Sequence, residues 1–324
     1  MRTALACWLL GLFVAMAAGA QGPAAYPSRS VTVVVPFPPG GGTDTGARIV
    51  AQKLSQKWGQ PVIIENKGGA AGMLGSEQAS KAKPDGYTLL MGNVGTLAIN
   101  PSLYGKKMTY NPQTAFAPVA LVAELPLMLL AGPSMPAKSA AELITIARSR
   151  PGKVTYSSSG SGGAPHLSAA IFERETRTEL LHVPYKGGGP AIADLIAGHV
   201  DISFATILEA SGHVKGGRLR ALAVTSDKRS AALPDIPTLA EAGLPGFNTA
   251  SWIGLLAPAG TPREIIEKIS RDVREAVATA DVRDQFITQG ATPAGSTPEA
   301  FAALIDRDRK RYAQIIQERS ITAD

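Results

Sequence analysis

The sequence predicts an α/β protein of two lobes, each built on a mostly parallel sheet flanked by helices. Strand-like and helix-like segments alternate along the chain, and the alternation restarts after a long extended run near its middle. Such alternation favours parallel strands with helices on both faces of the sheet. The length of 324 residues suggests roughly two domains.

The first α/β unit is expected in the N-terminal third of the chain. Residues 30–36 are a β-branched run typical of a strand, and residues 45–58 have the periodicity of an amphipathic helix. A second strand is expected at 61–65, a short helix at 75–82 and a third strand at 87–91. This β-α-β-α-β order indicates a parallel sheet.

The second unit follows an apolar, extended run at 118–130 that is interrupted by Pro126. Ser139 and Glu142 form a capping-box pattern that predicts a helix up to Arg148. The remaining expected elements are strands at 154–157, 181–185, 201–205 and 219–225 and helices at 165–176 and 190–197.

The C-terminal part is expected to return to the first lobe. Residues 249–257 resemble another strand, and two long amphipathic helices follow. Their starts are marked by Thr261-Pro262-Arg263-Glu264, where Thr261 is the expected cap, and by Thr297-Pro298-Glu299.

The predicted lobes are joined by crossing strands, because no flexible linker separates them. The first lobe is expected at 21–123 and 250–324, and the second at 124–249, with hinges near 123–127 and 248–252. Ligands of open α/β sheets bind outside the carboxyl ends of the strands. A ligand cleft is therefore expected between the lobes.

Residues 1–20 have the pattern of a signal peptide. Arg2 precedes an apolar run at 5–17, and Ala18-Gly19-Ala20 predicts cleavage before Gln21. An uncleaved anchor is the alternative. Cleavage would remove Cys7, the only cysteine, so neither a disulfide nor a cysteine-ligated metal is expected. The mature protein is expected in the periplasm.

Composition and charge argue against a nucleic-acid partner. The chain is 45% hydrophobic and 18% charged, as in an ordinary globular protein, with a formal net charge of +6. The densest basic cluster, at 306–311, contains acidic residues and reads as a solvated helix face. A mild positive field would instead attract an anionic small molecule.

A glycine-rich loop follows the first predicted strand. Gly40, Gly41 and Gly42 lead into Thr43 and Asp44 without the lysine of a phosphate-binding P-loop, and the dinucleotide fingerprint also fails. A strand, glycines and a helix start present backbone N–H groups that suit a carboxylate. Either Asp44 or Thr43 can cap the helix, and Asp44 can accept from an amine or hydroxyl. The alternative is an ordinary turn.

A similar loop follows a strand of the second lobe, in "VTYSSSGSGGAPHL" at 154–167. Its serines and glycines again precede a helix start, and a hydrolase nucleophile elbow fails around Ser161 because position 159 is Ser. His166 is expected either to contact the ligand or to cap and pack. Two such loops predict an anion clamp for a dicarboxylate or an amino acid.

Two further residues are candidates for the cleft. Asn93 follows the third strand, and Lys186 precedes another helix start, although a solvated surface lysine is the alternative. The four histidines lack metal-site spacing, and no carboxylate pair suggests acid–base chemistry. We therefore expect no metal site, and nothing in these patterns favours an enzyme.

The sequence resembles the Bug proteins, the substrate-binding receptors of tripartite tricarboxylate transporters. The resemblance spans the mature chain and rests on "YPSRSVTVVVPFPPGGGTD", "PVIIENKGGAAGMLG", "KPDGYTLLMG", "HVPYKGGGPAIADLIAGHVD" and "LRALAVTSDKRSAALPDIPTLAEAGLPGF". It implies a periplasmic Venus-flytrap fold of type II, without cofactor or catalytic residues. On this chain it points to ligand contacts from Phe37, Gly40, Gly41, Gly42, Thr43, Asp44, Ser159, Gly160, Gly162, Gly163 and His166.

The resemblance implies a solute-binding receptor rather than an enzyme. Such a receptor closes on a small carboxylate (a dicarboxylate, tricarboxylate, acidic amino acid or aromatic acid) and delivers it to membrane permease subunits. One alternative is a sensing receptor that docks on the periplasmic domain of a sensor kinase, and another is an exported α/β enzyme. Ligand identity does not transfer, since the segments around Phe37 and Ala164-Pro165 vary within the family.

Overall fold

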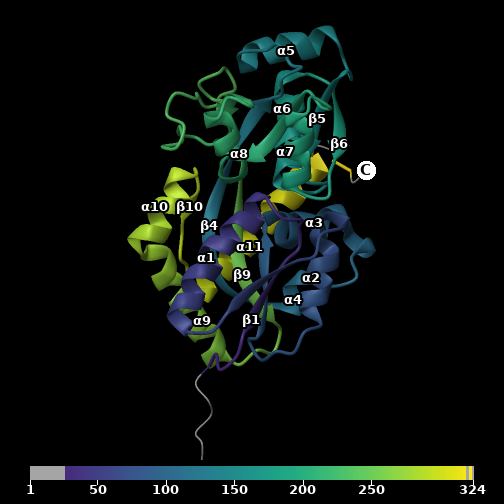
Figure 1. The fold of residues 1–324 in the computed structure, drawn as a ribbon. Coiled ribbons are helices and arrows are strands. Elements are labelled where there is room, and N and C mark those ends of the chain that lie inside the picture. Colours follow the sequence, from purple (N-terminus) through teal and green to yellow (C-terminus); the bar gives the residue numbers. More distant parts are fainter. Residues whose placement is uncertain (1–25, 319–320, 323–324) are drawn as a thin grey trace, which may run out of the picture.

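The structure is a computed structural model that describes residues 26–318 and 321–322. The predicted signal peptide, residues 1–20, lies outside the described residues. In Figure 1 the teal and green middle of the chain gathers at the top, and the purple N-terminal part lies below together with most of the C-terminal helices. The α/β prediction is confirmed.

The lower sheet contains three parallel strands continued by antiparallel ones. Strand β1 (Val31–Val35) lies between β2 (Val62–Asn66) and β3 (Thr88–Asn93), and all three are parallel. Strand β9 (Ala250–Pro258) joins β3 in antiparallel fashion and pairs in turn with β4 (Phe116–Ala131). The two-residue β10 (Thr292–Pro293) also pairs with β4.

The upper sheet repeats this plan. Strand β5 (Val154–Ser158) lies between β6 (Leu180–Pro184) and β7 (Ile202–Thr206), again all parallel. The second half of β4 pairs with both β7 and β8 (Arg220–Val224) in antiparallel fashion. The predicted restart of the α/β pattern is therefore confirmed.

Strand β4 runs through both sheets as one strand of 16 residues. Its first half pairs with β9 as far as Pro126 opposite Ala250, and its second half pairs with β7 from Leu127 opposite Thr206. The expected interruption at Pro126 is wrong. Proline lacks a backbone N–H. Pro126 lies where β4 changes its pairing partner from β9 to β7, so the strand continues although this residue cannot donate a hydrogen bond.

The helices flank the two sheets. The longer ones are α1 (Gly42–Trp58), α2 (Met73–Ser80), α5 (Ala140–Ser149), α6 (Ala164–Thr176), α7 (Gly188–Ile196), α8 (Ile207–Lys215), α9 (Arg263–Ala278), α10 (Ala280–Thr288) and α11 (Pro298–Glu318). Shorter turns are the 3₁₀ turns Ala70–Gly72 and Gly105–Lys107, the π-helical turn Gly95–Ile99, α3 (Asn100–Leu103) and α4 (Pro112–Ala115). Helices α8 and α10 were not expected from the sequence. No helix in the described part of the chain is long and apolar enough to cross a bilayer.

The C-terminal helices pack onto the core of the lower lobe, as expected. Val273 of α9 and Phe286 of α10 are buried with Val33 of β1, and Phe301 of α11 is buried with Leu90 of β3. The expected cap of α9 is wrong, however. The Thr261 hydroxyl donates to the Pro258 carbonyl, and the N-cap residue of α9 is Pro262, with no side-chain cap.

Candidate functional site

A small cavity lies where residues of the two lobes meet. Its volume is about 40 Å³. Its wall consists of Phe37, Gly41, Gly42, Thr43, Ala71, Asn93, Gly95, Leu125, Ser159, Gly160, Gly162, Gly163, Ala164, Pro165, Gly188, Thr206, Glu209 and Ser251.

Four helices begin at this cavity. Gly42 opens α1, Ala164 opens α6, Gly188 opens α7, and Thr206 is the cap of α8. The first N–H groups of a helix have no intrahelical acceptor, and that end of the helix carries partial positive charge. The cavity therefore favours an anion although no lysine or arginine lines it.

The loop before α1 places its backbone against the other lobe. Gly40 has φ of 88°, a left-handed conformation that favours glycine. At Gly42 a Cβ atom would lie 2.5 Å from the Thr206 hydroxyl. Glycine at position 42 therefore permits the close approach of the two lobes.

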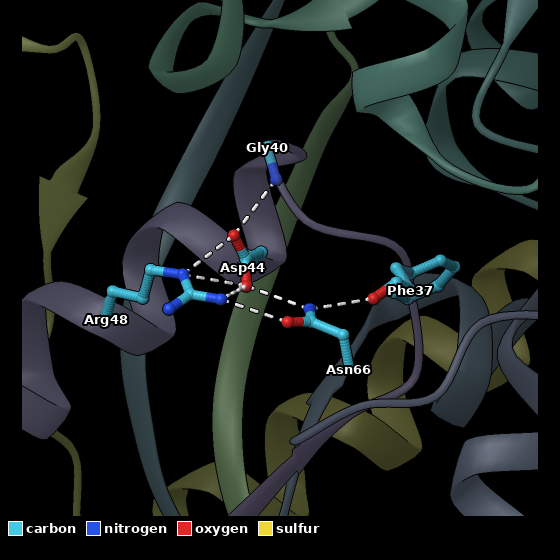
Figure 2. Close-up of polar contacts among 5 residues, drawn as sticks. All are labelled: Phe37, Gly40, Asp44, Arg48 and Asn66. Atoms are coloured by element: carbon cyan, nitrogen blue, oxygen red, sulfur yellow. Dashed lines mark hydrogen bonds and ion pairs between the residues drawn. The ribbon is translucent and has the colours of Figure 1, made fainter. Parts of the chain in front are cut away.

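The Asp44 side chain holds this loop from within its own lobe (Figure 2). Its carboxylate accepts hydrogen bonds from the Gly40 amide at 3.0 Å, from the Asn66 amide at 2.9 Å and from the Arg48 guanidinium at 3.0 Å. Asn66 also donates to the Phe37 carbonyl at 2.9 Å. Asp44 therefore stabilises the loop conformation. The expected cap by Asp44 or Thr43 is wrong, since the N-cap residue of α1 is Gly41 and no side chain makes a cap hydrogen bond there.

Burial raises the pKa of the Asp44 carboxyl, but the hydrogen bonds from Arg48, Gly40 and Asn66 outweigh it, so the pKa lies below its usual range. We expect Asp44→Asn to lower the free energy of unfolding at pH 7 by about 1–3 kcal/mol. A lowered folded-state pKa stabilises the protein above the unfolded value of about 3.9, and that stability is lost as the pH falls through the folded value.

Urea unfolding of Asp44→Asn and wild type from pH 7 to pH 3 measures this difference. The difference in the free energy of unfolding between the two proteins should stay constant down to about pH 5 and should shrink as the pH falls below the ordinary carboxyl pKa. Asp284→Asn, at an exposed ion pair with Arg283, is the control and should change stability by less than about 0.5 kcal/mol. A gap that does not depend on pH would contradict the account of Asp44.

The loop before α6 is the second half of the site. Gly160 and Gly162 have φ of 119° and 87°. The Gly160 amide donates to the Ser158 hydroxyl at 3.2 Å, and the Gly162 amide donates to Nδ1 of His166 at 3.2 Å. The His166 ring stacks on His182, with centroids 4.5 Å apart. The side chains of Ser158 and His166 therefore stabilise the conformation of this loop.

Glu209 of α8 connects the two lobes at the cavity. Its Oε1 accepts from the Thr206 amide at 2.8 Å, completing a capping box, and its Oε2 accepts from the Gly42 amide at 2.9 Å. Burial raises the pKa of this carboxyl above its usual range, and the hydrogen bonds from the Thr206 and Gly42 amides and the Thr206 hydroxyl offset the shift only in part. The first amide of α1 is therefore capped by a carboxylate from the other lobe.

The structure brings together most of the residues expected at the site. Those in the cavity wall are Phe37, Gly41, Gly42, Thr43, Asn93, Ser159, Gly160, Gly162 and Gly163. Those outside it are Gly40, Asp44, His166 and Lys186. Asn93 donates to the Thr43 hydroxyl at 3.2 Å, and Lys186 is exposed ahead of α7.

Sequence reasoning missed Thr206 and Glu209 in the cavity wall. Thr206 and Glu209 form the threonine-x-x-glutamate signature of a capping box, which predicts a helix start at that point. The signature gives no sign of the contact with Gly42. No group of three or more His, Cys, Asp or Glu side chains within the described residues is placed to hold a metal ion.

A second, larger cavity of about 560 Å³ lies at the crossing strands. Its wall includes Pro126 of β4 and Trp252 of β9 together with basic side chains of Lys228, Arg229, Arg307 and Arg311. Glu124, Asp227 and Asp308 also line it, so the surface has mixed charge. By charge alone it is the rival location for an anion.

Most of the chain matches one known protein family. Residues 46–321 match the family described as "Tripartite tricarboxylate transporter family receptor". Protein BugT of Bordetella pertussis (strain Tohama I / ATCC BAA-589 / NCTC 13251) is 36% identical over 313 residues, which cover 96% of this chain and 96% of BugT.

Solved structures of similar proteins have the same fold. The periplasmic binding protein BugD is 34% identical with a TM-score of 0.88, covering 92% of this chain and 100% of that one. Rpa4515 of R. palustris with adipate is 36% identical with a TM-score of 0.90, at 92% and 100% coverage. MatC (Rpa3494) from Rhodopseudomonas palustris with bound malate is 36% identical with a TM-score of 0.85, at 90% and 100% coverage.

Proposed function

The chain belongs to the tripartite tricarboxylate transporter receptor family, and we propose that it captures a small carboxylate between its two lobes. It is a solute-binding receptor of the two-lobed periplasmic-binding-protein fold. The observation that carries the proposal is the convergence of four helix N-termini, from both lobes, on one cavity. Backbone N–H groups at helix starts are suited to a carboxylate.

The ligand class follows from the chemistry of the cavity wall. Its polar side chains other than Glu209 are neutral, so backbone donors and helix dipoles must balance the ligand's charge. One or two carboxylates fit this supply of donors better than a polyphosphate, which usually requires a lysine or a metal ion. The adipate and malate complexes of relatives support this class.

We assign ligand contact to the two glycine loops and their neighbours. The proposed contacts are the backbone amide of Gly41 and the side chains of Phe37, Thr43, Asn93 and Ser159. Gly42, Gly160, Gly162 and Gly163 are proposed to let the main chain approach the ligand closely, since their own amides donate to Glu209, Ser158, His166 and the Gly160 carbonyl. Asp44 and His166 position these loops, because each binds a loop amide. Direct ligand contact by Gly40, Asp44, His166 or Lys186 stays a prediction.

Capture is proposed to be a hinge closure of the first lobe (21–123 and 250–324) on the second (124–249). The change of partners along β4 after Pro126 supports a boundary near residue 124. Ligand contacts made to both lobes would favour the closed arrangement.

We further propose that the protein is exported, with cleavage after Ala20, and works in the periplasm. There it would deliver its ligand to the permease subunits of a tripartite tricarboxylate transporter. The periplasmic description of BugD and the family description support this placement.

A thermal-shift panel tests the ligand class. Di- and tricarboxylates, acidic amino acids and aromatic acids are compared with sugars and nucleotides at equal concentration. A carboxylate at a hundred times its Kd should raise stability by about 2.7 kcal/mol, and hence the midpoint by about 5–10 °C. A midpoint raised by sugars or nucleotides and by no carboxylate would overturn the proposal.

A further inference from the structure

The wall of the interlobe cavity contains one ionisable side chain among its residues, all of which the structure describes: Glu209. The other polar side chains in that wall are neutral, namely Thr43, Asn93, Ser159, Thr206 and Ser251. An acidic residue is unexpected in a site that binds anions, since it opposes the positive field of the helix starts. Its presence calls for a role beyond the capping of α8.

The Glu209 carboxylate has capacity for another donor. Its oxygens accept backbone hydrogen bonds from Thr206 and Gly42 and a side-chain hydrogen bond from Thr206, whereas a carboxylate offers about four lone-pair sites. Glycines surround its Oε2, because Cβ atoms built at Gly41 and Gly188 would both contact it. The carboxylate is thus held at the cavity wall with about one acceptor position unused.

We propose that Glu209 determines specificity by selecting carboxylates that carry a hydroxyl or ammonium group over unsubstituted chains of the same length. This inference rests on the proposed function, since it takes a carboxylate ligand in this cavity as given. A hydroxyl or ammonium would donate a charge-assisted hydrogen bond to Glu209. A ligand without that donor presents only methylene or carboxylate groups there, and a carboxylate is repelled by the like charge.

Matched ligand series test the proposal by isothermal titration. One series is succinate, L-malate and L-aspartate, and the other is adipate, 2-hydroxyadipate and 2-aminoadipate. In at least one series the wild type should bind a substituted member about ten- to hundredfold more tightly than the unsubstituted acid. Glu209→Gln should reduce that ratio to about threefold or less, mainly by weakening the substituted ligand.

Glu142→Gln is the matched control. Glu142 is also a helix-capping glutamate, at the exposed start of α5, where it accepts from the Lys138 amide at 2.7 Å. The Glu142→Gln variant should show the same ratio of affinities, for the substituted over the unsubstituted acid, as the wild type. Gly188→Ala is a second test variant, because its methyl group would contact the Glu209 carboxylate and displace it. Gly188→Ala should also reduce this ratio of affinities, although the Glu209 side chain itself is unchanged.

The outcomes separate this inference from the proposed function. If no carboxylate in either series or in the thermal-shift panel binds the wild type, the proposed function fails. If carboxylates bind but the unsubstituted acid binds as tightly as its hydroxyl and amino counterparts, the role of Glu209 is overturned and the function stands. Retention of the wild-type ratio by Glu209→Gln would overturn it equally.

Discussion

Replacement of Gly42 by valine is expected to abolish ligand-induced stabilisation and to leave the ligand-free protein folded. A Cβ atom at this position would lie 2.5 Å from the hydroxyl and 3.3 Å from Cβ of Thr206. Thr206 belongs to the other lobe, where it caps α8. The added side chain therefore prevents the lobes from approaching, and it does not enter the core of either lobe.

The expected loss is at least about hundredfold in affinity, which corresponds to about 2.7 kcal/mol. Closure is needed for one ligand to contact both loops, so a variant held open retains only the contacts of one lobe. Bulk at Gly41 should have a similar, smaller effect, because its nearest neighbours across the lobes are 3.5 Å away.

Thermal shift and calorimetry with the best ligand of the panel measure this effect. Gly212→Val is the matched control, since Gly212 is an exposed residue of α8 with open space around it. It should bind like the wild type. Wild-type binding by Gly42→Val would mean that the loop before α1 is an ordinary turn.

Phe301→Ala is expected to have the largest effect on stability. Phe301 is fully buried in the lower lobe, where its ring packs edge-on against Trp252 with centroids 5.4 Å apart. It also fills the space above Gly254 of β9, where a Cβ atom would collide with the ring. Removal of a buried phenylalanine leaves a cavity and costs about 3–5 kcal/mol.

Urea unfolding measures this loss, and Leu74→Ala is the control, because Leu74 is 53% exposed. The control should change stability by less than about 1 kcal/mol. A loss of about 3–5 kcal/mol for Phe301→Ala would support the proposal that residues 250–324 belong to the first lobe, since Phe301 joins α11 to that lobe's sheet. A loss below about 1 kcal/mol for Phe301→Ala would contradict it.

Much of the fold could be predicted because its signals are local. The β-branched run at 30–36 and the period of 45–58 are patterns of neighbouring residues. The two glycine loops were also recognisable, since glycine before a helix start has a local backbone reason. Gly160, with φ of 119°, lines the cavity in a backbone conformation that favours glycine, whereas glycine at position 42 is required by the approach of Thr206 from the other lobe.

The missed features depend on contacts between distant residues. Glu209 meets the Gly42 amide across 167 positions of sequence, and no local pattern encodes that contact. Helix α8 was missed because it follows β7 without a loop and contains Gly212, a weak helix former. Asp44 was wrongly expected to cap its helix, because its carboxylate binds Asn66, 22 residues away, as well as Arg48; its contact with a ligand stays a prediction.

A crystal structure with the tightest carboxylate of the panel tests the central claim most directly. The account predicts a ligand carboxylate in the interlobe cavity, in the space between Gly42 and Gly163. The carboxylate should lie within hydrogen-bonding distance of a backbone amide in the first turn of α1 or α6. A ligand bound instead among the arginines of the larger cavity, near Arg307 and Arg311, would contradict it.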